Sequence, residues 1–338
     1  MAFKPTLKHI AETLQLSPST ISKALSGKAE VNEQTREQVL ACAEKLGYRF
    51  NKQHLSEKSE LRIAMVINCF DAIANQNTFF YDVFNAFHQH AAKLNIETIL
   101  MSIQDEWREN PETCKDYFNS KNIDGIVIAG LMKDDAFIKY LESPFALPMV
   151  LLDSSINNPL AGRVSIDGIS GVILGAEHLI ELGHKKIGFL NGHAKADVSK
   201  ERLIGFTAAL GLYGLPFSYN LVYEGDFTEM CGEPAADYFI ERGVSAVLCS
   251  SDLMAVGLIH GFQNKGLRIP QDISVVGFDN MGFCTLCTPK ITTIAQERDR
   301  LGITACELLK QLIHKGQINR CLLPPSLVIR ESTGKAPS

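Results

Sequence analysis

Polar side chains stand directly after several apolar runs that have the composition of buried strands, and their types could do chemistry. Asn68, Asp153 and Asp279 each follow such a run. Carboxylates accept hydrogen bonds from neighbouring hydroxyls, and an amide both donates and accepts. If the chain brings these side chains together, they suit a ligand that is rich in hydroxyl groups.

An arginine, an aromatic ring and a Ser-Asp pair extend this candidate set. Arg202 opens a helical pattern, Phe227 follows a short strand-like run, and Ser251-Asp252 follows another. Arg donates two parallel hydrogen bonds, and an aromatic ring covers the apolar face of a sugar. Each residue alone could equally be a turn former or a helix cap, Asp252 above all. The prediction of a sugar-like site therefore depends on all of them lying at strand ends.

A second group of candidate residues lies on a short helical segment near the N-terminus. Pro18 begins it and Ser17 precedes it, which predicts an N-cap followed by proline in the first turn. The residues that face outward are Ser19, Thr20, Ser22 and Lys23. Small hydrogen-bonding groups beside one cation suit the base edges and phosphates of DNA.

Two further helices must position this segment. Thr6 precedes an apolar stripe with helical spacing over residues 7–14, and Asn32 precedes a longer helix that ends at Gly47. Two short helices with a tight turn and a bracing third helix are typical of a helix-turn-helix. A three-helix bundle that mediates only protein contacts has the same pattern and remains an alternative.

From residue 61 onward, apolar strand-like runs alternate with helical patterns. The predicted strands are 61–67, 97–102, 125–129, 149–152, 186–190, 221–223, 246–249 and 274–277. The predicted helices are 79–94, 114–120, 136–141, 168–182, 200–212, 232–242 and 253–265. This alternation predicts parallel sheets covered on both faces, in two α/β halves with a cleft between them. Ligands of such sheets bind outside the carboxyl ends of the strands.

Length and charge indicate a small N-terminal domain, called the head, and a larger domain, called the body, that follows it. The 338 residues exceed the roughly 250–300 that one core supports. Residues 1–58 carry nine Lys or Arg and six Asp or Glu, a net charge of +3, whereas the remainder carries −8. A uniformly basic nucleic-acid binder is excluded, and an anionic partner is expected for the head alone.

Several function classes are disfavoured by the absence of their motifs. The sequence has no G-x-S-x-G, P-loop or H-E-x-x-H motif, and its histidines lack triad or metal spacing. The number of cysteines is nine, which is odd and favours reduced thiols over a set of disulfides. The single C-x-x-C motif, Cys284 to Cys287, is interpreted as structural. No secretory signal and no membrane-length apolar run is present. We therefore expect a cytoplasmic protein that is not an enzyme, with no cofactor and no metal.

The spacing of the head resembles the headpiece of the LacI-type (lactose-repressor, GalR-LacI) transcriptional regulators. The matching segments are Thr6-Leu-x-x-Ile-Ala, Leu16-Ser17-x-Ser-Thr20-Ile-Ser22-Lys-Ala-Leu25-Ser-Gly27, Val31-Asn-x-x-Thr35-Arg36 and Leu46-Gly47-Tyr48. The resemblance implies a recognition helix from Ser17 to Lys23. It assigns base contacts to Pro18, Ser19 and Lys23, and phosphate contacts to Thr6, Thr20, Ser22, Asn32 and Thr35.

The segment after the head departs from this family. Members usually carry Pro and Asn, then a hinge helix whose leucine wedges into the minor groove, a known way to kink DNA. Here Phe50 replaces the proline, the usual Ala-Arg pair is missing, and Leu55 is the wedge candidate. A polar linker without regular structure is the alternative. We expect a headpiece over 1–50 and a hinge over 51–60.

The body resembles the same family over nearly its whole length. Specific segments include Ser251-Asp252-x-Met-Ala255-x-Gly257 and Gly266-Leu-Arg-Ile-Pro270-x-Asp-Ile-Ser-Val-Val-Gly-Phe-Asp279. The family's effector contacts map onto Asn68, Phe79 or Phe80, Asp153, Arg202, Phe227, Ser251 and Asp279. Ser251 replaces the family's usual asparagine, which changes the hydrogen bonds expected there.

The resemblance implies an all-α helix-turn-helix headpiece plus an α/β periplasmic-binding-protein-like core of two Rossmann-like subdomains over 61–332. The expected N-subdomain spans about 61–161 and 291–321, and the expected C-subdomain spans about 162–290 and 322–332. Residues 333–338 are expected to form a disordered tail.

The expected function is sequence-specific transcriptional regulation, and we expect repression because most members of the family are repressors. Two headpieces of a homodimer would read the halves of a pseudo-palindromic double-stranded operator. A small-molecule effector, a sugar or sugar derivative, would bind between the subdomains and change operator affinity; nucleosides and purines stay open.

Overall fold

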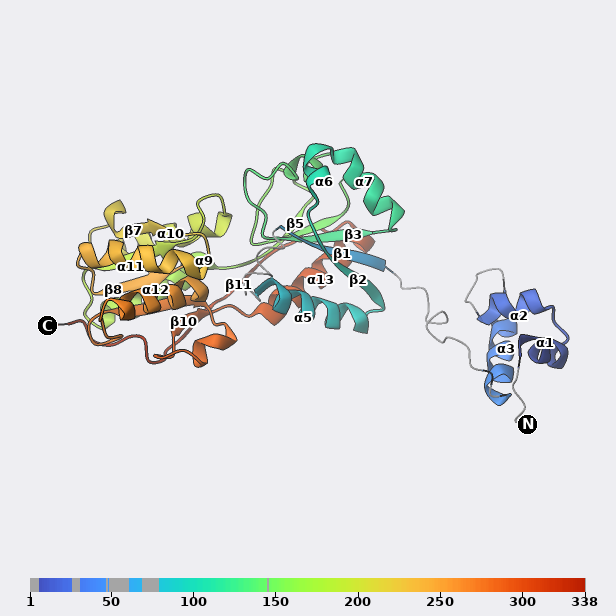
Figure 1. The fold of residues 1–338 in the computed structure, drawn as a ribbon. Coiled ribbons are helices and arrows are strands. Elements are labelled where there is room, and N and C mark those ends of the chain that lie inside the picture. The colour runs from blue at the N-terminus through green and yellow to red at the C-terminus, as the bar shows by residue number, and fades with distance from the viewer. Residues whose placement is uncertain are drawn as a thin grey trace. The chain divides into compact units, whose positions relative to one another are not determined.

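The fold is described from a computed structural model, in which residues 6–25, 31–46, 48, 61–68, 79–144 and 146–337 are described. The chain forms two compact units that divide near residue 61 (Figure 1). The predicted hinge over 51–60, with Leu55, lies outside the described residues.

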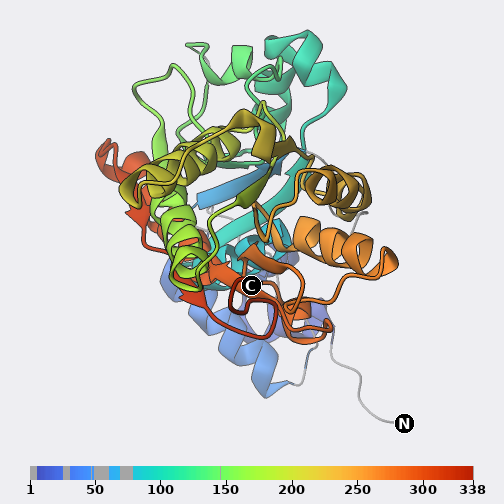
Figure 2. The same ribbon diagram turned by 90° about the vertical axis from the view of Figure 1, so that its left-hand side faces the viewer.

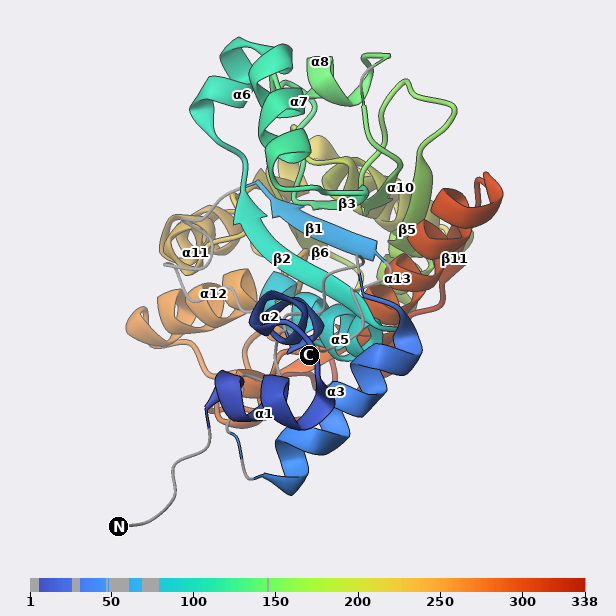
Figure 3. The ribbon, with the colours of Figure 1, turned by 90° about the vertical axis from the view of Figure 1, so that its right-hand side faces the viewer.

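The described residues of the small unit form three helices around one apolar core. They are α1 (Leu7–Leu14), α2 (Pro18–Leu25) and α3 (Glu33–Lys45). Ile10, Ile21 and Val39, one from each helix, are fully buried against one another. The three helices pack pairwise, as Figure 3 shows, because each presents one apolar stripe to the other two. The predicted helix-turn-helix is confirmed.

The predicted caps position these helices. Ser17 Oγ accepts a hydrogen bond of 3.1 Å from the Thr20 amide, and Asn32 Oδ1 accepts one of 2.8 Å from the Thr35 amide. Thr6 occupies the N-cap of α1 with extended backbone, and its amide donates to His9 Nδ1. Each cap satisfies a backbone donor that the helix itself cannot pair.

The large unit contains two sheets of six strands each. The first, in the order β11-β5-β4-β3-β1-β2, is called the N-lobe here, and the second, β12-β10-β9-β8-β6-β7, the C-lobe. The N-lobe strands are β1 (Leu61–Ile67), β2 (Ile96–Ser102), β3 (Gly125–Ala129), β4 (Met149–Leu152), β5 (Gly162–Ile166) and β11 (Arg320–Leu323). The C-lobe strands are β6 (Ile187–Asn191), β7 (Val222–Glu224), β8 (Ala246–Cys249), β9 (Ser274–Asp279), β10 (Thr292–Ala295) and β12 (Ser326–Val328).

Strand pairing is parallel in both sheets except where β12 meets β10 in antiparallel register. Strands such as β3 and β8 are buried along their whole length, because helices cover both faces of each sheet (Figures 1 and 2). Parallel neighbours also bring the carboxyl ends of several strands to one edge, where the candidate side chains follow.

Helices pack on both faces of each sheet. The N-lobe helices are α5 (Phe79–Lys93), α6 (Asp105–Glu109), α7 (Pro111–Ser120), α8 (Ile138–Leu141) and α13 (Arg298–Lys315). The C-lobe helices are α9 (Gly168–Glu181), α10 (Asp197–Leu212), α11 (Gly232–Glu241) and α12 (Asp252–Asn264), with short turns η2 (Tyr219–Leu221), η3 (Glu229–Cys231) and η4 (Gly282–Thr285). In each lobe two helices pack together on one face, α5 with α13 and α9 with α10.

Sheet membership corrects the predicted subdomain boundaries. Residues 162–166 are expected in the C-subdomain, but β5 pairs with β4 in the N-lobe. Residues 292–295 are expected in the N-subdomain, but β10 pairs with β9 in the C-lobe. The chain crosses between the lobes three times, and each short strand before a crossing completes the sheet that the chain is leaving. Helix α13 does return to the N-lobe as predicted.

The predicted disordered tail is also wrong for residues 333–337. Gly334 donates its amide to Ser274 Oγ, and its carbonyl lies 3.1 Å from the buried Nε2 of His184. The Ala336 amide donates to the carbonyl of Leu182. Pairing of these backbone groups fixes the segment on the C-lobe.

In the part of the chain that the structure describes, no helix is both long and apolar enough to cross a bilayer. The same residues contain no group of three or more His, Cys, Asp or Glu side chains arranged to hold a metal ion.

Candidate functional site

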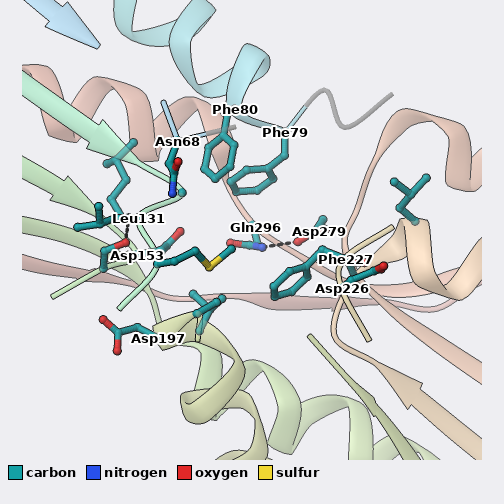
Figure 4. Close-up of a pocket in the computed structure, with 18 of the residues that line it drawn as sticks. Asn68, Phe79, Phe80, Leu131, Asp153, Asp197, Asp226, Phe227, Asp279 and Gln296 are labelled. Carbon is teal, nitrogen blue, oxygen red and sulfur yellow. Dashed lines mark hydrogen bonds between the residues drawn. The ribbon is translucent and has the colours of Figure 1, made fainter. Parts of the chain in front are cut away.

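A cavity of about 260 Å³ lies between the two lobes of the large unit (Figure 4). All eight predicted effector contacts line it: Asn68, Phe79, Phe80, Asp153, Arg202, Phe227, Ser251 and Asp279. Residues from both lobes therefore meet in one space, as expected from strand ends that face each other. Their role in ligand binding remains a prediction.

Arg202 is the central buried cation of the C-lobe wall. It lies on α10, and its side chain is only 5% exposed. One Nη donates to the carbonyl of Ser250, and the guanidinium carbon lies 3.9 Å from the centre of the Phe278 ring. Burial lowers its pKa, while the charges of Asp279 and Asp153 oppose that change. Its buried Nε has no partner among the described residues, so it is a donor available to a ligand.

Asp279 ends β9 and meets this arginine. Its carboxyl Oδ1 accepts a hydrogen bond of 2.5 Å from Gln296 Nε2. Burial raises its pKa to about 7, the Arg202 charge lowers it, and the like charge of Asp252 raises it further.

Asp252 lies behind the cavity and does not line it. It is fully buried, and it accepts hydrogen bonds from the Met281 amide at 2.7 Å and from Thr293 Oγ1 at 2.5 Å. These bonds tie the start of α12 to β10 and to the loop after β9. Asp252 is therefore a structural support for the wall, but it is not the helix cap that the sequence suggested, because α12 begins at Asp252 and its N-cap is Ser251.

Ser251 is the N-cap of α12, and its Oγ accepts the Met254 amide at 3.2 Å. The hydroxyl proton remains free to be donated into the cavity. Phe227 has a φ of 68°, and a Cβ on Gly192 would lie within 2.0 Å of its ring. A side chain at position 192 would overlap the Phe227 ring, so glycine at this position allows the ring to lie beside the cavity.

Asp153 and Asn68 are the polar groups of the N-lobe wall that the sequence predicted. Asp153 follows β4 with a φ of 51°, and its Oδ1 accepts the Ile166 amide at 3.0 Å. Burial raises the pKa of Asp153 to about 6. Asn68 Oδ1 accepts a hydrogen bond of 2.7 Å from Arg108, which Asp135 orients in turn. The Asn68 amide group is left to donate.

Aromatic rings complete the N-lobe wall. Phe79 and Phe80 begin α5, and their ring centres lie 5.3 Å apart in an edge-to-face arrangement. Figure 4 shows both rings beside Asn68 and above Gln296, with Phe227 below Gln296. A flat ligand with an apolar face and hydroxyl edges would contact rings and carboxyls together.

Most of the predicted DNA-contacting residues lie at the start of the head helices, and Ser22 and Lys23 lie further along α2. Thr6, Ser17, Pro18, Ser19, Ser22 and Asn32 are exposed, and Thr20, Lys23 and Thr35 are partly buried. Ser17 Oγ lies 2.8 Å from both Ser19 Oγ and Thr20 Oγ1. Thr6, Ser17 and Asn32 cap three helix N-termini, where backbone amides favour phosphate. These contacts remain predictions.

Comparisons with known proteins agree with both units. The family described as "Bacterial regulatory proteins, lacI family" matches residues 6–51, and a periplasmic binding protein-like domain matches 176–333. The HTH-type transcriptional repressor PurR of Photobacterium profundum is 30% identical over 97% of this chain and 98% of its own length. The chain belongs to the LacI family.

Solved structures of LacI-family proteins have the same fold over the same length. The Lac repressor dimer bound to operator and the anti-inducer ONPF is 27% identical, with a TM-score of 0.77, covering 98% of this chain and all of that one. A transcriptional regulator CelR–cellobiose complex is 26% identical, with a TM-score of 0.75, covering 97% and 100%. The resemblance and the fold class predicted from the motifs are confirmed, and this LacI-family chain is a DNA-binding transcriptional regulator.

Sequence reasoning missed several cavity residues of this LacI-family regulator. They include Leu131, Met132, Asp197, Asp226, Met281, Phe283 and Gln296. Gln296 is 6% exposed, and its Oε1 has no partner among the described residues, so it is an acceptor available to a ligand. It directly follows β10, and treating residues 292–295 as a strand would have found it by the same strand-end rule.

Proposed function

We propose that the chain is a homodimeric repressor whose affinity for operator DNA is set by a neutral carbohydrate bound between the lobes. The observation that carries the proposal is the composition of the cavity wall. Carboxyls of Asp153, Asp197, Asp226 and Asp279 face it together with aromatic rings, and Arg202 is the one cation among the described residues that line it.

The balance of charge distinguishes between carbohydrate classes. Arg202 is already opposed by Asp279 and Asp153, so a phosphorylated ligand would meet net negative charge in a buried space. A neutral sugar brings hydroxyls that donate to the carboxyls and an apolar face for the rings. The wall therefore favours neutral sugars over sugar phosphates.

The same wall supports binding without chemical conversion. The Ser251 hydroxyl accepts a hydrogen bond from the Met254 amide, and among the described residues no hydrogen bond links it to a general base. PurR and the Lac repressor are repressors, which supports a ligand-binding role and, because a repressor acts on chromosomal DNA, a cytoplasmic location.

On the DNA side, we propose that α2 enters the major groove, with Lys23 and Ser19 reading bases. The caps of the three head helices would contact phosphates, which carry most of the affinity. Two headpieces of a dimer would then read a pseudo-palindromic site with half-sites related by two-fold symmetry.

A ligand screen tests the effector part. Thermal unfolding of the full chain is followed with neutral monosaccharides and disaccharides, sugar phosphates and nucleosides. We expect a rise in Tm with a neutral sugar, and the Arg268→Met variant, altered in an exposed ion pair, should respond equally. A rise only with phosphorylated sugars or with nucleosides would contradict the proposal.

Selection from random duplex DNA tests the operator part. We expect a two-fold symmetric site, and Lys23→Ala should weaken its binding by about 1–3 kcal/mol and relax one base position per half-site. Fluorescence anisotropy, repeated with each ligand from the screen, measures the change in affinity. Equal binding of selected and random duplex would contradict sequence-specific recognition.

A further inference from the structure

Loops that are distant in the chain join the two lobes at one rim of the cavity. Lys133 and Asp134 follow β3 and Ser155 follows β4, all in the N-lobe. Lys195 and Asp197 follow β6 in the C-lobe. We propose that these five residues form a charged latch that holds the lobes in their present arrangement without a ligand.

Asp197 provides the central contacts of the latch. Its Oδ1 lies 2.8 Å from Lys133 Nζ, and its Oδ2 accepts hydrogen bonds of 2.8 Å from both the amide and the hydroxyl of Ser155. The side chain is only 12% exposed, so solvent screens these contacts less than it screens a surface pair. Asp197 is also the first residue of α10, where the helix dipole favours a negative charge.

Two further contacts cross the same rim. Lys195 Nζ pairs with Asp134, and the Lys133 amide donates to the Lys195 carbonyl at 3.0 Å. The backbone bond keeps the loops in register, so that the two charged pairs form side by side. The Lys195–Asp134 pair is exposed and weak by itself, whereas the Lys133–Asp197 pair includes the largely buried Asp197 carboxylate.

The latch differs in kind from the other contacts between the lobes. Arg163 pairs with Glu201, and Arg298 donates to the Asp279 carbonyl, but both contacts lie beside segments where the chain itself crosses. Such contacts stay close when lobes rotate about the crossings. The latch residues belong to the loops after β3, β4 and β6, none of which is a crossing segment, so relative movement of the lobes would separate them.

The latch also faces the cavity. Asp197 lines it, and so do Met132 and Ala196, which neighbour Lys133, Lys195 and Asp197 in sequence. Figure 4 shows Asp197 at the edge of the pocket, away from Asp279 and Gln296. A ligand that reaches this edge would change the environment of the latch, which couples occupancy of the cavity to the position of the lobes.

Amide hydrogen exchange in the full, ligand-free chain tests the latch, and it does not depend on the identity of any effector. The Lys133 and Ser155 amides donate across the rim, so their exchange reports latch opening. The amides of β3 serve as an internal reference for the N-lobe core. The readout is the exchange rate of peptides over 130–136 and 153–157 relative to that reference.

Asp197→Asn and Asp134→Lys should each raise this relative rate by about two- to fivefold, the range for loss of one ion pair. The double variant D134K/K195D restores opposite charges at two positions that are more than half exposed, and should return the rate toward wild type. Asp272→Asn breaks an ion pair within the C-lobe and should leave it unchanged. In 1 M salt, the difference between wild type and D134K should shrink, because the Lys195–Asp134 pair is more than half exposed, whereas the difference between wild type and D197N should persist.

The proposal is overturned if D197N and D134K exchange like D272N, or if the double reversal exchanges no more slowly than D134K. Because these rates are measured without ligand or DNA, failure of the latch would leave the proposed repressor function intact. A negative result in the ligand screen would likewise not contradict the proposed latch.

Discussion

The two walls of the cavity come from lobes of the same architecture, yet they present different chemistry. The C-lobe wall centres on Arg202, a buried cation whose charge is opposed by Asp279 and Asp153. The N-lobe wall combines the rings of Phe79 and Phe80 with polar groups that neighbouring side chains hold in place, as Arg108 holds Asn68. The C-lobe wall therefore contributes the buried cation, and the N-lobe wall contributes the rings, an oriented amide and the carboxyl of Asp153.

This difference arises from burial. Arg202 is 5% exposed, so removing it leaves the carboxylates of Asp279 and Asp153 in a buried environment of low polarity, where an unpaired charge is unfavourable. Arg108 is partly exposed, so a water molecule can replace part of the hydrogen bonding that its guanidinium provides to Asn68. We infer that the C-lobe wall determines whether a ligand binds and that the N-lobe wall adjusts how tightly it binds.

The largest effect is expected for Arg202→Met. The methionine keeps much of the length and apolar volume but leaves Asp279 and Asp153 without their cation, which costs about 3–5 kcal/mol of folding stability. Ligand-induced rises in Tm should disappear, while operator affinity measured below the Tm should stay near wild type. The Arg268→Met control should retain both its stability and its ligand response, and a full ligand response in Arg202→Met would remove the proposed role of this wall.

The second effect concerns pH and Asp279. Its pKa is about 7 in the fold and about 3.8 when unfolded, so the folded state binds more protons between these values. The stability that Asp279 contributes is complete below about pH 4 and is lost as pH rises through about 7. The free energy of unfolding of wild type minus that of Asp279→Asn should therefore decrease from pH 4 to 7.

Chemical denaturation at several pH values measures this difference. The subtraction cancels groups that do not interact with Asp279, including His178 and His184, whose pKa burial lowers. If the difference in unfolding free energy between wild type and Asp279→Asn stays constant or increases with pH, the pKa of Asp279 is not raised in the folded state and the prediction is wrong.

The smallest effect is expected for Arg108→Met in the N-lobe wall. Asn68 loses the hydrogen bond that orients it, and its amide must be ordered by the ligand itself. Affinity for a ligand from the screen should fall by about fivefold, equivalent to roughly 1 kcal/mol for one hydrogen bond. Isothermal titration measures the change, with Arg62→Met, which alters an arginine of the same lobe that does not line the cavity, as control. A loss as large as that of Arg202→Met would show that the two walls contribute equally.

Much of the site was predictable because parallel strands place their carboxyl ends at one edge. That rule located Asn68, Asp153, Ser251 and Asp279, and all four line the cavity. It failed at Gln296, because residues 292–295 were not predicted as a strand: two threonines open β10, so it lacks the continuous apolar run of β4 and β8. It also could not distinguish Asp252 as a support from Ser251 as a wall residue, since both follow β8.

The sequence by itself determined the alternation of strands and helices, the helix caps at Ser17 and Asn32, and the family. These follow from local hydrogen bonds and periodic burial, which act over a few residues. Only the tertiary structure decided that β5 and β10 belong to the lobes they do, that residues 333–337 pack on the C-lobe, and that Asp197 meets Lys133. Those contacts join residues far apart in the chain, and pairing of distant groups leaves no periodic trace in sequence.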